Sequence, residues 1–130
     1  MRVRDCMTTA AVTVGPDHTL RQAAQVMAQR NTGAALVLDP DGAGPGIITE
    51  RDVLRSVAAD EDPDREIVRE HLTPEVTVTV PDADLRAAAT AMINGGFRHL
   101  VVVSEDSQVL GMLSIRDIVR SWVQEPTPVG

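Results

Sequence analysis

Two short segments of the sequence place a hydroxyl and a carboxylate at the same spacing. Gly46–Asp52 and Gly111–Asp117 share the form Gly-apolar-apolar-Thr/Ser-x-x-Asp. At the start of a helix, Thr49 or Ser114 can accept a hydrogen bond from a backbone N–H while the Asp three residues later reaches back, which is a capping box. The same groups can also bind a phosphate at the helix N-terminus and ribose hydroxyls at the Asp. Capping explains either segment alone. It does not explain why both segments have Asp where Glu would serve, or why both have Gly three residues before the Thr or Ser.

Both segments belong to an internal repeat of the chain. Pro16–Arg21 recurs as Pro81–Arg86, an offset of 65 positions that needs no gap. The same offset aligns a helical pattern and two Arg-Asp pairs, namely Ala23, Ala24, Met27 and Arg51–Asp52 with Ala88, Ala89, Met92 and Arg116–Asp117. The acidic stretch 60–64 then separates two copies of similar size. We expect half-domains at residues 1–61 and 62–124, followed by a tail at 125–130.

Each copy predicts the order strand, helix, strand, strand, helix. Alternation rich in β-branched residues predicts the first strands, and continuous apolar runs predict second strands that are covered on both faces. The expected elements are 12–14, 19–31, 34–38, 46–48 and 49–59 in the first copy, and 76–80, 84–96, 100–103, 111–113 and 114–124 in the second, with turns at 39–42 and 104–107. This order is typical of an α+β protein whose small sheets pack with helices.

The charge and composition exclude several classes of partner. With 12 Lys+Arg against 19 Asp+Glu the net charge is -7, which disfavours duplex nucleic acid and anionic membrane as main partners. Phe97 and Trp122 are the only aromatic residues, so the usual stacking platform for single-stranded nucleic acid is missing. No apolar run has the length of a membrane span and no signal-peptide core is present, so we expect a cytoplasmic chain. The single Cys6 makes no internal disulfide.

The repeat, the element order and the two segments together resemble a tandem pair of CBS domains, the Bateman module. The Met7–Thr8 and Leu72–Thr73 openings of the two copies fit the same family, and the resemblance extends from Val3 to Trp122. It implies two half-domains related by a pseudo-twofold axis, with two clefts that bind adenosine-containing ligands. In that family the Asp holds the ribose hydroxyls, the Thr or Ser meets ribose or phosphate, apolar strand residues sandwich the adenine, and basic residues before the second strand neutralise phosphates.

Carried over residue by residue, the resemblance implies two sites. The Asp117 site consists of Asp117, Ser114, Met112 as an adenine wall, Arg98 and His99 for phosphate, Arg116, and a facing edge at Thr8 and Ala11. The Asp52 site consists of Asp52, Thr49, Ile47, Arg51, Thr73 and Val76. Gly33 and Ala34 stand where the second copy has Arg98 and His99. We therefore expect the Asp52 site to lack the phosphate clamp and to bind more weakly.

The function implied is a regulatory sensor that requires no cofactor. Its ligand is AMP, ADP or ATP, with S-adenosylmethionine or NAD as alternatives. The competing hypothesis is a ligand-free dimerisation adaptor in which both segments are only caps, but an adaptor has no need of two cations at Arg98 and His99. An enzyme is disfavoured because no nucleophile elbow is present. A metal site is disfavoured because Cys6 and His71, which are equivalent in the repeat, offer at most two ligands.

The last helix predicts self-association. Ile118, Val119, Trp122 and Val123 form an apolar stripe that a thin half-domain leaves uncovered, so we expect a homodimer. A chain of 130 residues has no room for a fused effector domain, so the expected signal passes to a separate, unknown effector protein.

Overall fold

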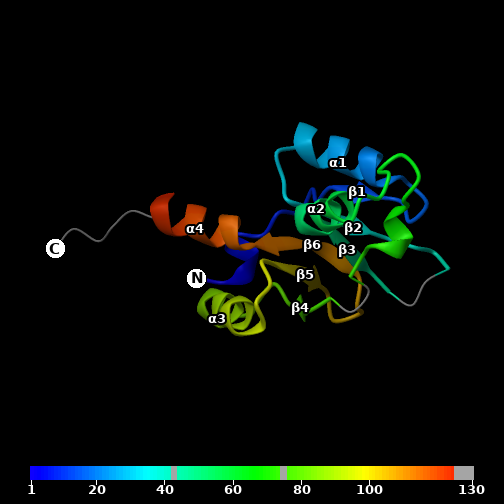
Figure 1. Cartoon of the computed structure of the whole chain (residues 1–130). Coiled ribbons are helices and arrows are strands. Elements are labelled where there is room, and N and C mark those ends of the chain that lie inside the picture. The colour runs from blue at the N-terminus through cyan, green and yellow to red at the C-terminus, as the bar shows by residue number, and fades with distance from the viewer. Residues whose placement is uncertain (42–43, 74–75, 125–130) are drawn as a thin grey trace. The chain divides into compact units, whose positions relative to one another are not determined.

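The strands of each repeat copy form a sheet of their own. The computed structural model describes residues 1–41, 44–73 and 76–124. One sheet has the order β1-β2-β3 and the other β4-β5-β6, with a parallel first pair and an antiparallel second pair in each (Figure 1). The strands are β1 Thr13–Val14, β2 Ala34–Val37, β3 Gly46–Thr49, β4 Val78–Thr79, β5 His99–Val103 and β6 Val109–Ser114. The α+β class and the element order are confirmed, while β1 and β4 are shorter than expected.

The described residues also form four α-helices and two short 3-10 helices. They are η1 Val3–Asp5, α1 Leu20–Gln29, α2 Glu50–Ala58, η2 Val68–Glu70, α3 Leu85–Gly95 and α4 Ile115–Gln124. Thr19 caps α1 through a capping box with Gln22, and Gly96 ends α3 in the left-handed conformation at φ 71°. The helix positions thus agree with the sequence pattern. Gly42 of the expected turn and the tail at 125–130 lie outside the described residues.

No helix in the part of the chain that the structure describes is long and apolar enough to cross a membrane.

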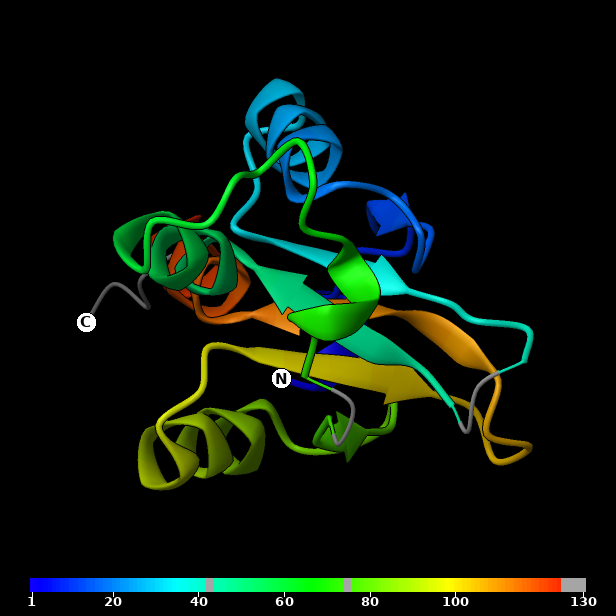
Figure 2. The same cartoon turned by 45° about the vertical axis from the view of Figure 1, so that its right-hand side comes forward.

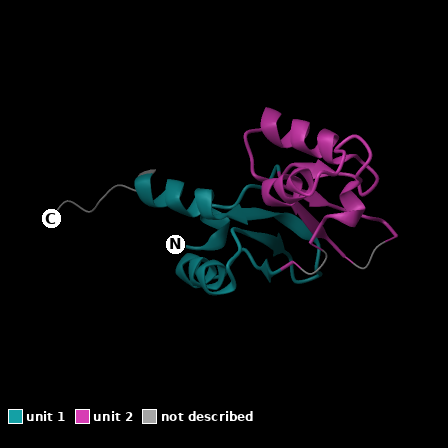
Figure 3. Cartoon of the chain, in the orientation of Figure 1, with its two compact units in different colours: residues 1–10, 77–130 teal, residues 11–76 magenta. Residues whose placement is uncertain are grey.

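The opening of each copy packs into the unit built on the other copy. By contacts, unit 1 comprises Met1–Ala10 and Thr77–Gly130, and unit 2 comprises Ala11–Val76 (Figure 3). Val3 and Val68, which are equivalent in the repeat, are both fully buried, in unit 1 and unit 2 respectively. Burying a valine side chain contributes about 1.5 kcal/mol or more. Each unit therefore draws part of its stability from the copy that supplies its opening segment.

Backbone hydrogen bonds repeat this exchange at the same offset. The N–H of Val3 donates to the carbonyl of Ala83 at 2.9 Å, and the N–H of Val68 donates to that of His18 at 2.8 Å. Equivalent groups are thus bonded in both units, which confirms the ungapped repeat in three dimensions.

In each unit the two α-helices contact each other and their sheet. Figure 2 shows α1 beside β2 and α3 beside β5. In α1, Leu20, Ala23 and Met27 are buried against the sheet, and α3 buries Leu85, Ala88, Ala89 and Met92 in the same way. Small alanines at these positions allow the close helix-on-sheet packing that a core almost without aromatics requires. Met27 and Met92 are core residues at equivalent positions of the two copies.

One expectation for α4 is wrong. Ile118 was expected in an exposed stripe, but it is fully buried in the core of unit 1. It lies three residues after Ile115, which also packs on that core, so these two define the inner side of the helix. Val119, Trp122 and Val123 lie on the outer side and are 49%, 55% and 78% exposed.

Candidate functional site

The carboxylate of Asp117 is fixed at the start of α4 by a capping box. The N–H of Ser114 donates to Oδ2 of Asp117 at 2.9 Å, and the N–H of Asp117 donates to Oγ of Ser114 at 3.0 Å. The other oxygen, Oδ1, lies 3.5 Å from Oγ1 of Thr8 and 3.8 Å from Nη1 of Arg120. The side chain of Asp117 is 11% exposed. Capping and ligand binding are therefore compatible, since the cap uses one oxygen and orients the other.

The backbone of Thr8 forms the edge that faces this carboxylate. Thr8 and Met112 exchange two hydrogen bonds, of 2.9 and 3.0 Å, in an isolated antiparallel bridge. A Cβ on Gly111 would lie 2.3 Å from the carbonyl oxygen of Thr8, so only glycine allows this approach. The glycine that capping left unexplained is thus required by the incoming edge. The side chain of Met112 is buried.

Two basic residues, Arg98 and His99, lie at the start of β5. His99 pairs with Ser114 in the antiparallel register, and the carbonyl of Arg98 accepts from the N–H of Ile115 at 2.9 Å. The side chain of Arg98 is exposed and, among the residues that the structure describes, forms no ion pair. His99 is half-buried, and Arg116 is exposed in the first turn of α4.

Seven of the eight residues expected at the Asp117 site belong to unit 1. They are Thr8, Arg98, His99, Met112, Ser114, Arg116 and Asp117. The eighth, Ala11, belongs to unit 2 and is half-buried there.

The Asp52 site repeats this geometry within unit 2. The N–H and Oγ1 of Thr49 both donate to Oδ2 of Asp52, at 2.8 and 2.9 Å. Ile47 and Thr73 exchange backbone hydrogen bonds of 3.2 and 2.9 Å, as Met112 and Thr8 do in unit 1. Arg51 is exposed on α2, and Val76 is half-buried at the end of the unit. Unit 2 therefore carries the same hydroxyl, carboxylate and strand edge.

The two sites differ at the position of the basic residues. The carbonyl of Gly33 accepts from the N–H of Glu50 at 2.9 Å, so Gly33 is the structural counterpart of Arg98. A Cβ on Gly33 would lie 2.9 Å from Oε1 of Glu50. The carboxylate of Glu50 therefore lies where unit 1 carries the side chain of Arg98. The sequence analysis showed that the Asp52 site lacks counterparts of Arg98 and His99, but it did not predict that Glu50 lies there. A signal was present, because the offset of 65 aligns Glu50 with the uncharged Ile115.

Comparison with known proteins gives one consistent family. Residues 3–59 and 68–123 match the family model of the CBS domain. The CBS domain-containing protein YhcV of Bacillus subtilis is 33% identical over 117 residues, which are 89% of this chain and 81% of that protein. Several other curated relatives are longer, and the chain spans between 16% and 56% of their length.

Solved structures agree with this match. A protein with CBS domains from Burkholderia ambifaria has a TM-score of 0.88 at 26% identity, with all of both chains covered. A CBS domain protein from Pyrobaculum aerophilum, solved in complex with AMP, has a TM-score of 0.80 at 28% identity over 90% of this chain and 89% of that one.

Proposed function

The chain belongs to the CBS domain family as a tandem pair, and we propose that it is a regulatory module that binds an adenosine phosphate at the Asp117 site. The observation that carries the proposal is the orientation of Asp117. Its Oδ2 is held by the N–H of Ser114, and its Oδ1 points to the edge formed by Thr8. A carboxylate fixed in this way can accept hydrogen bonds from a ribose diol without first losing side-chain freedom.

The groups around Asp117 match the remaining parts of such a ligand. Met112 provides an apolar wall for adenine, and the Ser114 hydroxyl and the N-terminus of α4 favour an anion. Arg98 supplies planar guanidinium donors for a phosphate, with His99 beside it in sequence. The AMP complex of the protein from Pyrobaculum aerophilum supports this ligand class. These groups can hold and orient a ligand, so the proposed role is binding and regulation.

The Asp52 site has a different preference in this proposal. Glu50 places a negative charge where Arg98 stands in unit 1, and a carboxylate repels a phosphate. The Asp52 site therefore favours an adenosyl compound without phosphate, or remains empty while the Asp117 site is filled.

A ligand-free adaptor is the second candidate function. Both carboxylates make complete capping boxes, which by themselves stabilise the starts of α2 and α4. The exposed apolar side of α4, with Val119, Trp122 and Val123, supports self-association, and we propose a homodimer in either case. The sensor and the adaptor both pass their signal to a separate effector protein.

A thermal-shift screen distinguishes the two functions. AMP, ADP, ATP, S-adenosylmethionine, NAD and cyclic dinucleotides are each added to the purified protein. A ligand at 100 times its Kd stabilises the folded state by about 2.7 kcal/mol, which raises the Tm by several degrees. The same shift is then measured in Asp117→Asn and Asp52→Asn, whose amide oxygens can still accept the cap hydrogen bond. The sensor predicts a shift with AMP or ATP that Asp117→Asn abolishes and Asp52→Asn retains; the adaptor predicts no shift with any ligand.

A further inference from the structure

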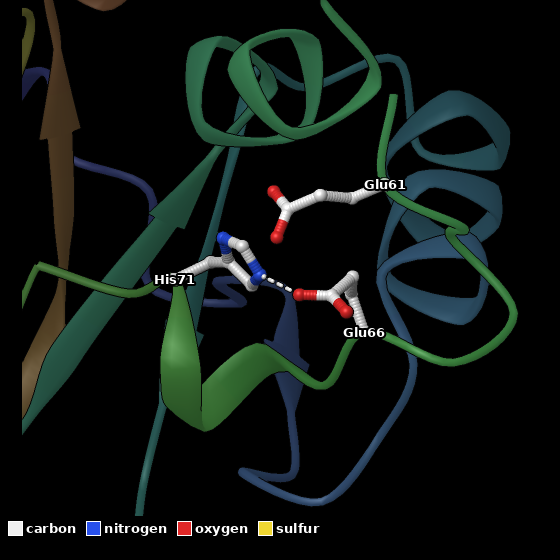
Figure 4. Close-up of side chains that lie close together, drawn as sticks. All are labelled: Glu61, Glu66 and His71. Carbon is white, nitrogen blue, oxygen red and sulfur yellow. Dashed lines mark hydrogen bonds and ion pairs between the residues drawn. The ribbon is translucent and has the colours of Figure 1, made fainter. Parts of the chain in front are cut away.

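Three side chains of unit 2, outside both candidate sites, bring possible metal ligands together. Glu61 follows α2, Glu66 precedes η2 and His71 ends it, and their side chains turn toward one another (Figure 4). Nε2 of His71 lies 2.8 Å from Oε1 of Glu66, and one ligand atom of each residue lies within 4.8 Å of the others. The side chains of His71 and Glu66 are only 17% and 24% exposed. Carboxylates were not counted as ligands in the sequence expectation, so it missed this group.

The repeat supplies an internal comparison for this cluster. The offset of 65 aligns Glu66 with Met1 and His71 with Cys6, and Sγ of Cys6 lies 3.5 Å from Sδ of Met1. The same two positions therefore touch in both units with unrelated side chains. The fold requires a contact at this point, but it does not require an imidazole and a carboxylate, nor a second carboxylate beside them.

Neither glutamate of the cluster forms an ion pair with an arginine among the described residues. Among the described residues, Glu66 forms an ion pair only with His71, and Glu61 forms none. The arginines of unit 2 that form ion pairs do so with aspartates: Arg21 with Asp64, Arg65 with Asp62, and Arg69 with Asp17 and Asp39. The two carboxylates repel each other at this distance, and a divalent cation bound between them offsets that repulsion.

We propose that Glu61, Glu66 and His71 bind a divalent transition-metal cation, for which Zn²⁺ is the best match. Zn²⁺ accepts imidazole nitrogen and carboxylate oxygen at about 2.0–2.2 Å, so two ligands on a tetrahedral ion are about 3.4 Å apart. His71 and Glu66 are already near that separation, and the exposed Glu61 reaches it by a change of rotamer. Three protein ligands leave a fourth position for water or for a group from another molecule. The bound cation links the segment after α2 to η2, so it also stabilises unit 2.

Calorimetric titration with Zn²⁺ tests the site. The full chain is titrated in the Cys6→Ser background, so that the thiol contributes no binding. We expect one Zn²⁺ per chain, a rise in Tm on addition of Zn²⁺, and an affinity at least about tenfold lower in both His71→Ala and Glu61→Gln, because each loses one ligand. Glu61 is exposed and makes no side-chain hydrogen bond or ion pair among the described residues, so Glu61→Gln keeps the fold even if His71→Ala weakens it.

Glu70→Gln is the matched control. Glu70 lies beside His71 in the sequence, is exposed and lies outside the cluster, and its substitution removes the same charge. It should leave the Zn²⁺ affinity within about twofold, since an exposed charge is lost but no metal ligand. The proposal is overturned if the parent binds no Zn²⁺ at 100 µM, or if Glu61→Gln and Glu70→Gln reduce the affinity equally. In either case His71 and Glu66 form an ion pair only.

Discussion

Oγ1 of Thr8 lies 3.5 Å from Oδ1 of Asp117, although the two residues come from opposite ends of the sequence. Thr8 lies in the opening segment that the first copy contributes to unit 1, and Asp117 lies in the last helix of the second copy. The pair meets because Val3 is buried in the core of unit 1 and the backbone of Thr8 pairs with Met112 of β6 in an isolated bridge. The candidate site therefore depends on the exchange of opening segments as much as on the Thr/Ser-x-x-Asp motif.

Replacing Gly111 by Ala should damage this edge. The new Cβ would lie 2.3 Å from a backbone oxygen of Thr8, so the edge must move. We expect Gly111→Ala to destabilise the protein by about 1–3 kcal/mol, as overpacking does, and to weaken AMP binding. Urea unfolding and calorimetry measure the two effects.

Gly46→Ala is the matched control for that change. Its Cβ would lie 2.9 Å from Cδ1 of Leu72, the far end of a flexible side chain, so the neighbouring group can move at lower cost. Equal losses of stability in Gly46→Ala and Gly111→Ala would contradict the role given to Gly111.

Removing the charge of Glu50 should improve phosphate binding at the Asp52 site. In an Asp117→Asn background, Glu50→Gln removes a carboxylate from the position equivalent to Arg98. Removing a unit charge about 4 Å from the phosphate in water removes about 1 kcal/mol of repulsion, which raises the AMP affinity about fivefold. This gain should disappear at 1 M salt. Calorimetry with AMP measures it. Glu70→Gln serves as the control, and an equal gain from that variant would show that only the net charge matters.

Local features of the fold were predictable because their signals lie within a few residues. The cap at Thr19, the end of α3 at Gly96 and the buried strand β2 agree with the sequence pattern. The inner side of α4 was not predictable in the same way, because Ile118 and Val119 are equally apolar and only contacts with the sheet and α3 decide which is buried.

Features that join distant residues were the least accessible to sequence reasoning. The family resemblance implied that Thr8 faces the Asp117 site, but nothing in its own neighbourhood indicates pairing with Met112. The contact of Glu50 with Gly33 and the cluster at His71 likewise depend on how separate segments pack. Cysteine and histidine are recognised as possible metal ligands from the sequence. A single glutamate among many is not, because only the fold shows which glutamate lies near them.

The outer side of α4 should hold two copies of the chain together. Trp122 is 55% exposed on this side, and Trp122→Glu places a charge in the proposed interface. We expect sedimentation to show a dimer for the parent and a monomer for Trp122→Glu at tens of micromolar. Leu110→Glu, at an apolar residue of β6 that is 39% exposed, should remain a dimer. A monomeric parent would contradict the prediction.

The most direct measurement compares AMP with adenosine in Arg98→Ala. Arg98 is exposed and unpaired among the described residues, so its loss should leave the free energy of unfolding within about 0.5 kcal/mol. A charge-assisted hydrogen bond to phosphate contributes roughly 1.5–3 kcal/mol, so the AMP affinity should fall about tenfold to hundredfold by calorimetry. Adenosine, which has no phosphate, should bind the variant and the parent alike. An equal loss for both ligands, or no binding of AMP to the parent protein, would contradict a phosphate clamp at the Asp117 site.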